Sequence, residues 1–181
     1  MNSDATNTPE ESLVEAESPL IDPAKAEALF AQLVKQQNLP LGLLAGFVAA
    51  VLGGLAWAAV TIVSGYQIGW MAVGIGFLVG FAVRLAGKGL TKSFGFGGGL
   101  LALLGCLLGN LLAVCGMLAQ ELQQPVLSTT LQIVLNPPAA IELMKMTFSP
   151  MDLLFYGIAV FEGFKFSFRQ IDDSELNAML G

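Results

Sequence analysis

The sequence predicts an all-α, polytopic membrane protein: a bundle of four transmembrane helices, with both termini in the cytoplasm and short helices at the membrane surface. Only 12% of its 181 residues are charged, about half the share usual in globular proteins. Residues 36–83 and 93–120 contain no Asp, Glu, Lys or Arg. So little polar surface cannot cover a soluble fold, and the lysines and arginines fall mainly on one side of the apolar segments.

The first 21 residues are predicted to form a disordered acidic tail, because they combine low hydrophobicity with charge of one sign. Asp22 followed by Pro23 is typical of a helix start, with a capping side chain and a proline at the first helical position. Residues 22–37 then place apolar side chains on one face. They predict an amphipathic helix in the cytosol, either on the membrane surface or packed under the bundle.

Four segments in residues 38–169, the predicted membrane domain, are long and apolar enough to approach the roughly 20 residues that a membrane span needs. The predicted spans are residues 41–63, 69–86, 98–119 and 150–168. The fourth is the least apolar, but Ser149, Pro150 and Asp152 match the capped start of a helix. Residues 170–181 form an acidic C-terminal tail.

The orientation follows from the lysines and arginines, which concentrate in cytoplasmic loops. With four spans and both termini inside, every one of the eight except Lys145 lies on the cytoplasmic side. Five residues are predicted to anchor the bundle at the two membrane surfaces. They are Tyr66 and Trp70 on the outer side, and Arg84, Lys88 and Lys92 on the inner side. Trp57 either anchors near the outer surface or packs inside.

Small residues recur every four positions in the first three spans, which is the pattern that lets helix backbones approach closely in lipid. The predicted packing glycines are Gly42, Gly46, Gly54, Gly76, Gly80, Gly105 and Gly109. These stripes predict either a tight monomeric bundle or a contact with a second copy or another subunit. The fourth span lacks such a stripe and is expected at the periphery of the bundle.

Three polar residues within the predicted spans are candidates for function, since ionisable groups in a membrane are costly. Glu162 and Lys165 share a helix face, and we expect them to pair and reach the inner surface. Asn110 lies near the middle of the third span. It either hydrogen-bonds to another helix or lines a polar path.

Other patterns point away from catalysis and from cofactors. The chain has no histidine, and its two cysteines, Cys106 and Cys115, are about 13 Å apart along one helix. We therefore expect no metal site and no cofactor. The glycine-rich segment 87–99 lacks the residues and the preceding strand of a phosphate-binding loop, so it is expected to be a flexible link. No basic patch predicts binding to nucleic acid.

The connection at residues 121–149 is long, and it predicts one or two short helices on the outer surface or one re-entrant segment. Such a connection offers a lid or a docking site for a partner.

The segment GYQIGWMAVGIGFLVGFAVR (65–84), together with SPMDLLFYGIAVFEGFKFSFR (149–169), resembles a group of small, uncharacterised bacterial multi-pass membrane proteins. The resemblance covers roughly residues 40–170 and implies the bacterial inner membrane, without implying an activity. Some members of this group carry a cysteine-rich zinc ribbon before the spans, and no cysteine precedes Cys106 here.

The sequence thus favours a non-enzymatic membrane protein that serves as a scaffold, assembly factor or accessory subunit through its helix contacts. Its expected partners are membrane lipids and either a second copy or another membrane protein. The alternative is a small oligomeric transporter or channel with Glu162 and Asn110 near its path. An enzyme is disfavoured because no nucleophile–base pair or metal cluster is visible.

Overall fold

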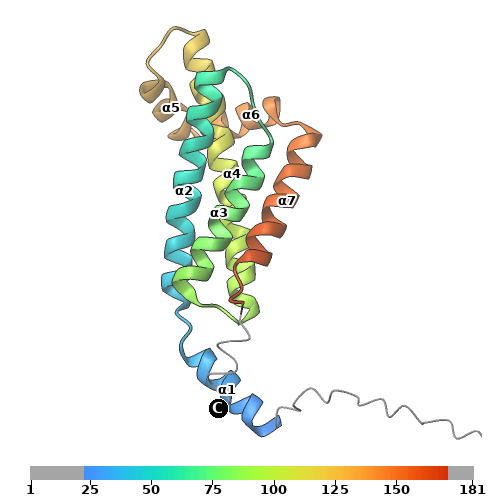
Figure 1. The fold of residues 1–181 in the computed structure, drawn as a ribbon. Coiled ribbons are helices and arrows are strands. Elements are labelled where there is room, and N and C mark those ends of the chain that lie inside the picture. The colour runs from blue at the N-terminus through green and yellow to red at the C-terminus, as the bar shows by residue number, and fades with distance from the viewer. Residues whose placement is uncertain (1–22, 171–181) are drawn as a thin grey trace, which may run out of the picture.

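The computed structural model describes residues 23–170, and within this range the protein has seven helices and no strands (Figure 1). The acidic tail predicted for residues 1–21, the predicted cap Asp22 and residues 171–181 of the C-terminal tail lie outside the described residues. The helices are α1 (Pro23–Lys35), α2 (Leu39–Ser64), α3 (Trp70–Gly87), α4 (Lys92–Glu121), α5 (Val126–Val134), α6 (Pro137–Thr147) and α7 (Pro150–Phe166).

Four helices, α2, α3, α4 and α7, lie side by side along one axis (Figure 1). Helices α2 and α4 run in one direction, whereas α3 and α7 run in the other. The end of the bundle that carries Lys88, Lys92 and Lys165 is called the basic end, and α1 extends from it. Helices α5 and α6 cover the opposite end, which is called the α5–α6 end.

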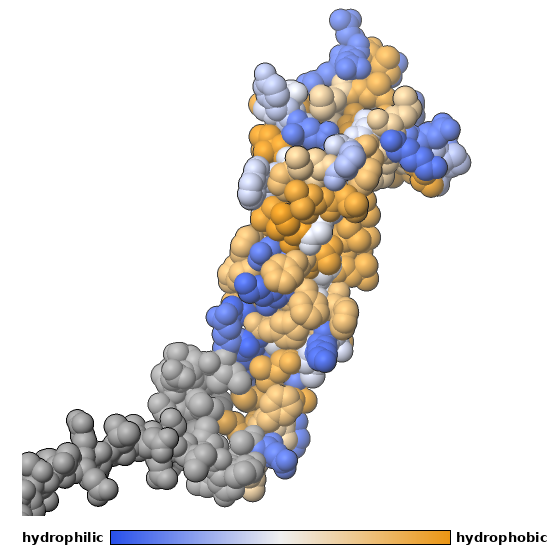
Figure 2. Space-filling model, turned by 90° about the vertical axis from the view of Figure 1, so that its right-hand side faces the viewer, coloured by the Kyte–Doolittle hydropathy of each residue, from blue (hydrophilic) through white to orange (hydrophobic). Residues whose placement is uncertain are grey.

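Helices α2, α3 and α4 are each long and apolar enough to cross a membrane, which indicates a membrane protein. Helix α7 has 17 residues, or about 25 Å of helix, and packs along α3 and α4. Figure 2 shows the α7 side of the molecule, where a broad apolar zone lies below the polar groups at the α5–α6 end. Many large apolar side chains are exposed on the bundle, including Leu44, Leu85 and Leu153.

The closest approach between α2 and α4 is made by small residues. A Cβ atom added to Gly54 would lie 3.1 Å from the carbonyl oxygen of Gly105, and one added to Gly105 would lie 3.2 Å from the Cα of Ala50. At the basic end, a Cβ on Gly42 would lie 3.0 Å from the Cα of Gly87 in α3. These backbones therefore touch because their side chains are absent or small.

Helix α7 is an integral part of the bundle, which corrects the expectation that it lies at the periphery. A Cβ on Gly76 of α3 would lie 2.8 Å from the Cα of Ala159, and Gly163 meets Ala102 and Gly98 of α4 in the same way. Ala159 and Gly163 are four residues apart on one face. The fourth predicted span therefore contains a small-residue stripe, and the prediction that it lacks one is wrong.

The segment predicted as a flexible link, residues 87–99, is mostly helical. Helix α4 begins at Lys92, six residues before the predicted span. Glycines in its first turns are packing sites, because Gly95 faces Phe164 and Phe168 while Gly98 faces Ser167. The short turn before α4 is held by Gln37, whose Oε1 accepts hydrogen bonds from the backbone N–H groups of Leu90 (3.1 Å) and Thr91 (3.3 Å).

The long connection between α4 and α7 forms two short helices, α5 and α6. Their predicted position on the outer membrane surface stays a prediction. Both contact α4 and each other. Their exposed faces carry large apolar side chains, with Leu127 72% and Met146 84% exposed. Figure 1 shows that they lie beside the α5–α6 end of the bundle, and residues of α5 face the side of α2 near Ala58 and Ile62.

Candidate functional site

Polar side chains from three helices are buried together inside the half of the bundle near the α5–α6 end. Trp57 and Thr61 lie one turn apart on α2, Asn110 lies on α4 and Tyr156 lies on α7. None of the four is more than 4% exposed. We call these four residues the polar cluster.

Within the polar cluster, the aromatic rings of Trp57 on α2 and Tyr156 on α7 contact each other. The ring centroids of Trp57 and Tyr156 are 6.5 Å apart and meet edge to face at 83°, an arrangement that aromatic pairs favour. The Trp57 ring also contacts α4, because a Cβ on Gly109 would lie 3.1 Å from its Cε3 atom. Trp57 thus packs inside the bundle, which settles the alternative that the sequence left open.

Asn110 is connected to the outside of the bundle by one hydrogen bond. Its Oδ1 accepts from Nε2 of Gln67 at 2.8 Å. Gln67 is an exposed residue in the link between α2 and α3, so its side chain reaches inward from the α5–α6 end. The predicted interhelical bond of Asn110 is therefore made to a loop residue, and Gln67 closes the polar cluster from above.

Four polar atoms of the cluster have no hydrogen-bond partner among residues 23–170: Trp57 Nε1, Thr61 Oγ1, Asn110 Nδ2 and the Tyr156 hydroxyl. The Tyr156 hydroxyl lies beside Asn110, but no well-aligned hydrogen bond joins them. A buried polar group without a partner costs about 1–3 kcal/mol, and such groups usually bind ordered water. Each of the four can donate a hydrogen bond. The cluster therefore suits water or a solute rich in acceptor atoms.

The position of Tyr156 is set by the start of α7. The Ser149 side chain caps this helix by accepting from the Met151 N–H at 3.2 Å, and the Asp152 carboxylate accepts from the Ser149 N–H at 2.9 Å. This reciprocal pair matches the predicted helix start. Asp152 is 8% exposed and lies one turn before Tyr156, so the capping carboxylate also borders the cluster.

Glu162 and Lys165 are placed differently from the prediction. No ion pair joins these two described residues. The Oε2 atom of Glu162 is buried without a hydrogen-bond partner. The Nζ atom of Lys165 instead lies 5.8 Å from the Phe161 ring centroid and 5.6 Å from that of Phe166. Because rings attract cations through their faces, Lys165 turns toward them. Glu162 lies six residues, or about 9 Å of helix, beyond Tyr156, the member of the polar cluster on α7.

The remaining predicted residues are distributed over the two ends and the helix contacts. Tyr66 and Trp70 are 75% and 69% exposed at the α5–α6 end. Lys88 and Lys92 are exposed at the basic end, while Arg84 donates to Gln170 at 3.4 Å. All seven predicted packing glycines face another helix within the bundle. Cys106 and Cys115 are both free and buried.

Sequence reasoning missed Gln67, which donates a hydrogen bond to Asn110. It also missed Thr61 and Tyr156 as members of the polar cluster. Thr61 and Tyr156 sit in otherwise apolar helix segments, where a hydroxyl is unusual enough to be noticed. Gln67 sits in a turn, and no local pattern indicates that its side chain folds inward.

Taken together, the structure defines an all-helical protein with three helices able to cross a membrane and a buried polar cluster. The chain matches no known protein family, no curated protein and no solved structure.

Proposed function

We propose that the protein is a four-span membrane protein of the bacterial inner membrane, with both termini in the cytoplasm, acting as a non-enzymatic scaffold or accessory subunit. Helix α7 is the fourth span. The positive-inside rule supports this orientation, because Lys88, Lys92 and Lys165 gather at the basic end whereas Lys145 lies in α6 at the other end.

The observation that carries the proposal is the way in which small residues close the bundle. Gly54 meets Gly109, and Gly76 meets Ala159, with contacts that involve backbone atoms on both sides. The four helices therefore hold one another and leave an apolar exterior with exposed leucines and phenylalanines. Such a rigid body suits the role of holding other membrane components in place.

The experiment has two parts. Reporter domains fused after Gln123 and after Gly181 are expected to report opposite sides of the membrane. The same side for both would reject four spans with this orientation. The protein is then expected to co-purify in a mild detergent with a partner protein at a fixed ratio. Purification without any partner protein would reject the scaffold function.

The polar cluster favours a second candidate, a small oligomeric transporter or channel. Its unpartnered donors lie in the membrane domain and are reached from the α5–α6 end through Gln67. Under this alternative, the wild-type protein in proteoliposomes carries a solute or ion flux. Replacing Asn110 with Leu would abolish the flux while the protein stays folded. Absence of any wild-type flux would reject it.

A further inference from the structure

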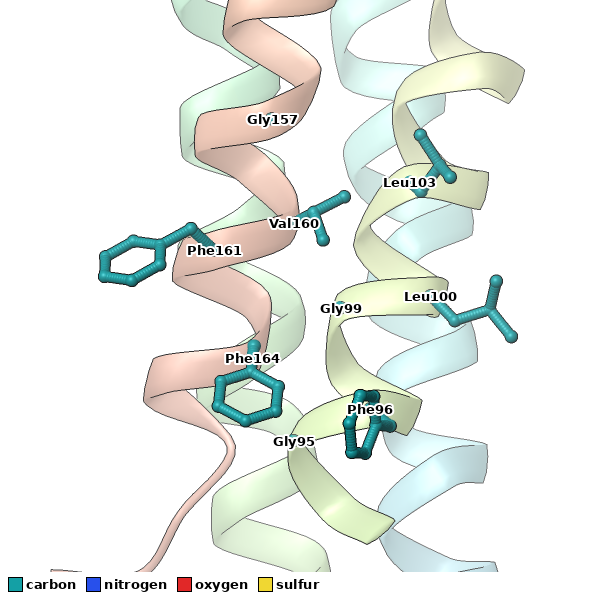
Figure 3. A pocket seen from close by; sticks show the side chains of 9 residues that line it. All are labelled: Gly95, Phe96, Gly99, Leu100, Leu103, Gly157, Val160, Phe161 and Phe164. Carbon is teal, nitrogen blue, oxygen red and sulfur yellow. The ribbon is translucent and has the colours of Figure 1, made fainter. Parts of the chain in front are cut away.

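An apolar groove of about 510 Å³ runs between α4 and α7 on the outside of the bundle (Figure 3). Three glycines and several large apolar side chains line it. Gly157 is exposed, whereas Gly95 and Gly99 are buried where α4 meets Phe164 and Val160 of α7. The side chains that line the walls are Phe96, Leu100, Leu103, Val160, Phe161 and Phe164. Val160 points from α7 toward α4 in Figure 3.

The groove has the length of one membrane leaflet. It extends along α4 from Gly95 to Leu103, which is about 12 Å at 1.5 Å per residue. Half of a hydrocarbon core of about 30 Å is about 15 Å. The groove begins one turn inside the basic end and stops near mid-bundle, so it faces a single leaflet.

Two lysines, Lys92 and Lys165, lie near the end of the groove that is closest to the basic end. Lys165 lies at the edge of the groove: its Nζ is 5.8 Å from the ring of Phe161, which lines the groove, and 5.6 Å from the ring of Phe166, which does not. No described residue forms an ion pair with its ammonium. Lys92 is exposed and lies four residues before Phe96, so the two share a face of α4. An apolar groove that ends at two lysines matches a lipid with an anionic headgroup.

We propose that the groove is a binding site for one anionic phospholipid of the cytoplasmic leaflet. One acyl chain lies in the groove over Gly157, and the phosphate lies at the basic end within reach of Lys92 and Lys165. The site rests on the proposed orientation, which places the basic end at the cytoplasmic surface.

The shape of the groove favours a lipid chain over a partner helix. The rings of Phe96 and Phe164 meet at 5.5 Å across the end nearest the basic end. A helix with its side chains is about 10 Å wide and would collide with this pair. A single acyl chain is thinner and can pass over the ring pair on its way from a headgroup at the basic end.

Gly157 allows a clean test, because a Cβ atom added there meets nothing within 4 Å. The replacement Gly157→Leu therefore fills the groove without disturbing the bundle. Gly74 of α3 is the matched control, because it is also exposed, helical and without a neighbour within 4 Å. For the headgroup, Lys92→Gln and Lys165→Gln are compared with Lys145→Gln at the other end.

The measurement is a count of bound lipids by native mass spectrometry after titration with phosphatidylglycerol or phosphatidylcholine of equal chain length. We expect the protein to bind one phosphatidylglycerol tightly and phosphatidylcholine more weakly. Gly157→Leu is expected to weaken binding about tenfold, through the loss of a few buried methylene contacts. Each groove lysine is expected to contribute about fivefold, and both controls should bind as the wild type does.

Equal retention of the two lipids, or unchanged binding by Gly157→Leu, would overturn the lipid site. So would a cross-link between two copies through position 157, because it would show that a second chain occupies the groove. These failures are distinct from failure of the proposed membrane protein itself. In that case the protein would be monodisperse in water without detergent, and no lipid titration would be needed.

Discussion

Gly54 of α2 and Gly109 of α4 touch backbone to backbone, since a Cβ added to Gly109 would lie 3.1 Å from the Gly54 Cα. The two helices run in the same direction, and the Trp57 ring packs beside the contact. Helices in lipid gain little from hiding leucine. This crossing therefore sets the distance between α2 and α4 and, with it, the position of the polar cluster.

Replacing Gly109 with Leu is expected to destabilise the protein by about 1–3 kcal/mol, because overpacking of a tight contact forces backbones apart. Thermal unfolding in a mild detergent measures the change. Gly74→Leu is the control and should unfold as the wild type does, since its added side chain meets open space. An equal effect of both variants would show that leucine lowers stability by some route other than the crossing.

The hydroxyl and the ring of Tyr156 are expected to contribute very differently to stability. The hydroxyl has no hydrogen-bond partner, so Tyr156→Phe should leave the unfolding free energy unchanged or raise it. The ring packs against Trp57 and Phe148, so Tyr156→Ala should cost about 3–5 kcal/mol. Denaturant titration of both variants provides the comparison. A marked loss in Tyr156→Phe would mean that the hydroxyl binds a buried water.

Gln37 is expected to protect the turn between α3 and α4. Its Oε1 accepts from two backbone N–H groups and from the Thr91 hydroxyl, and each such bond contributes about 0.5–1.5 kcal/mol. Gln37→Leu should therefore speed hydrogen exchange at Leu90 and Thr91, as measured by mass spectrometry. Gln132→Leu is the control because Gln132 is exposed in α5, at the other end of the bundle. Unchanged exchange in Gln37→Leu would show that helix packing alone holds the turn.

The long helices were predictable from composition, because apolar length alone marks α2, α3 and α4. The first and last residues of these helices were less predictable. Segment 87–99 looks flexible because glycine favours turns, yet in α4 the missing side chains of Gly95 and Gly98 admit Phe164 and Ser167. Tertiary packing thus overrides the low helix propensity of glycine.

The candidate site was predictable only in part. Asn110 stands out because an amide within an apolar span needs a partner, but the identity of that partner depends on how the helices meet. Gln67 is 43 residues away from Asn110 along the chain. The stripe of Ala159 and Gly163 was visible in the sequence but was not recognised. It brings Tyr156 into the interior.

Glu162→Gln is expected to stabilise the protein by about 1 kcal/mol or more. The buried Oε2 of Glu162 has no hydrogen-bond partner, and an unpaired charge inside an apolar bundle is costly. The amide keeps the shape of the side chain and removes its charge. Thermal unfolding in detergent measures the effect, with the exposed Glu142→Gln in α6 as the control. A clear loss of stability in Glu162→Gln would show that the carboxylate has a cationic partner in the membrane. Such a result would support the ion pair with Lys165 that the sequence predicts.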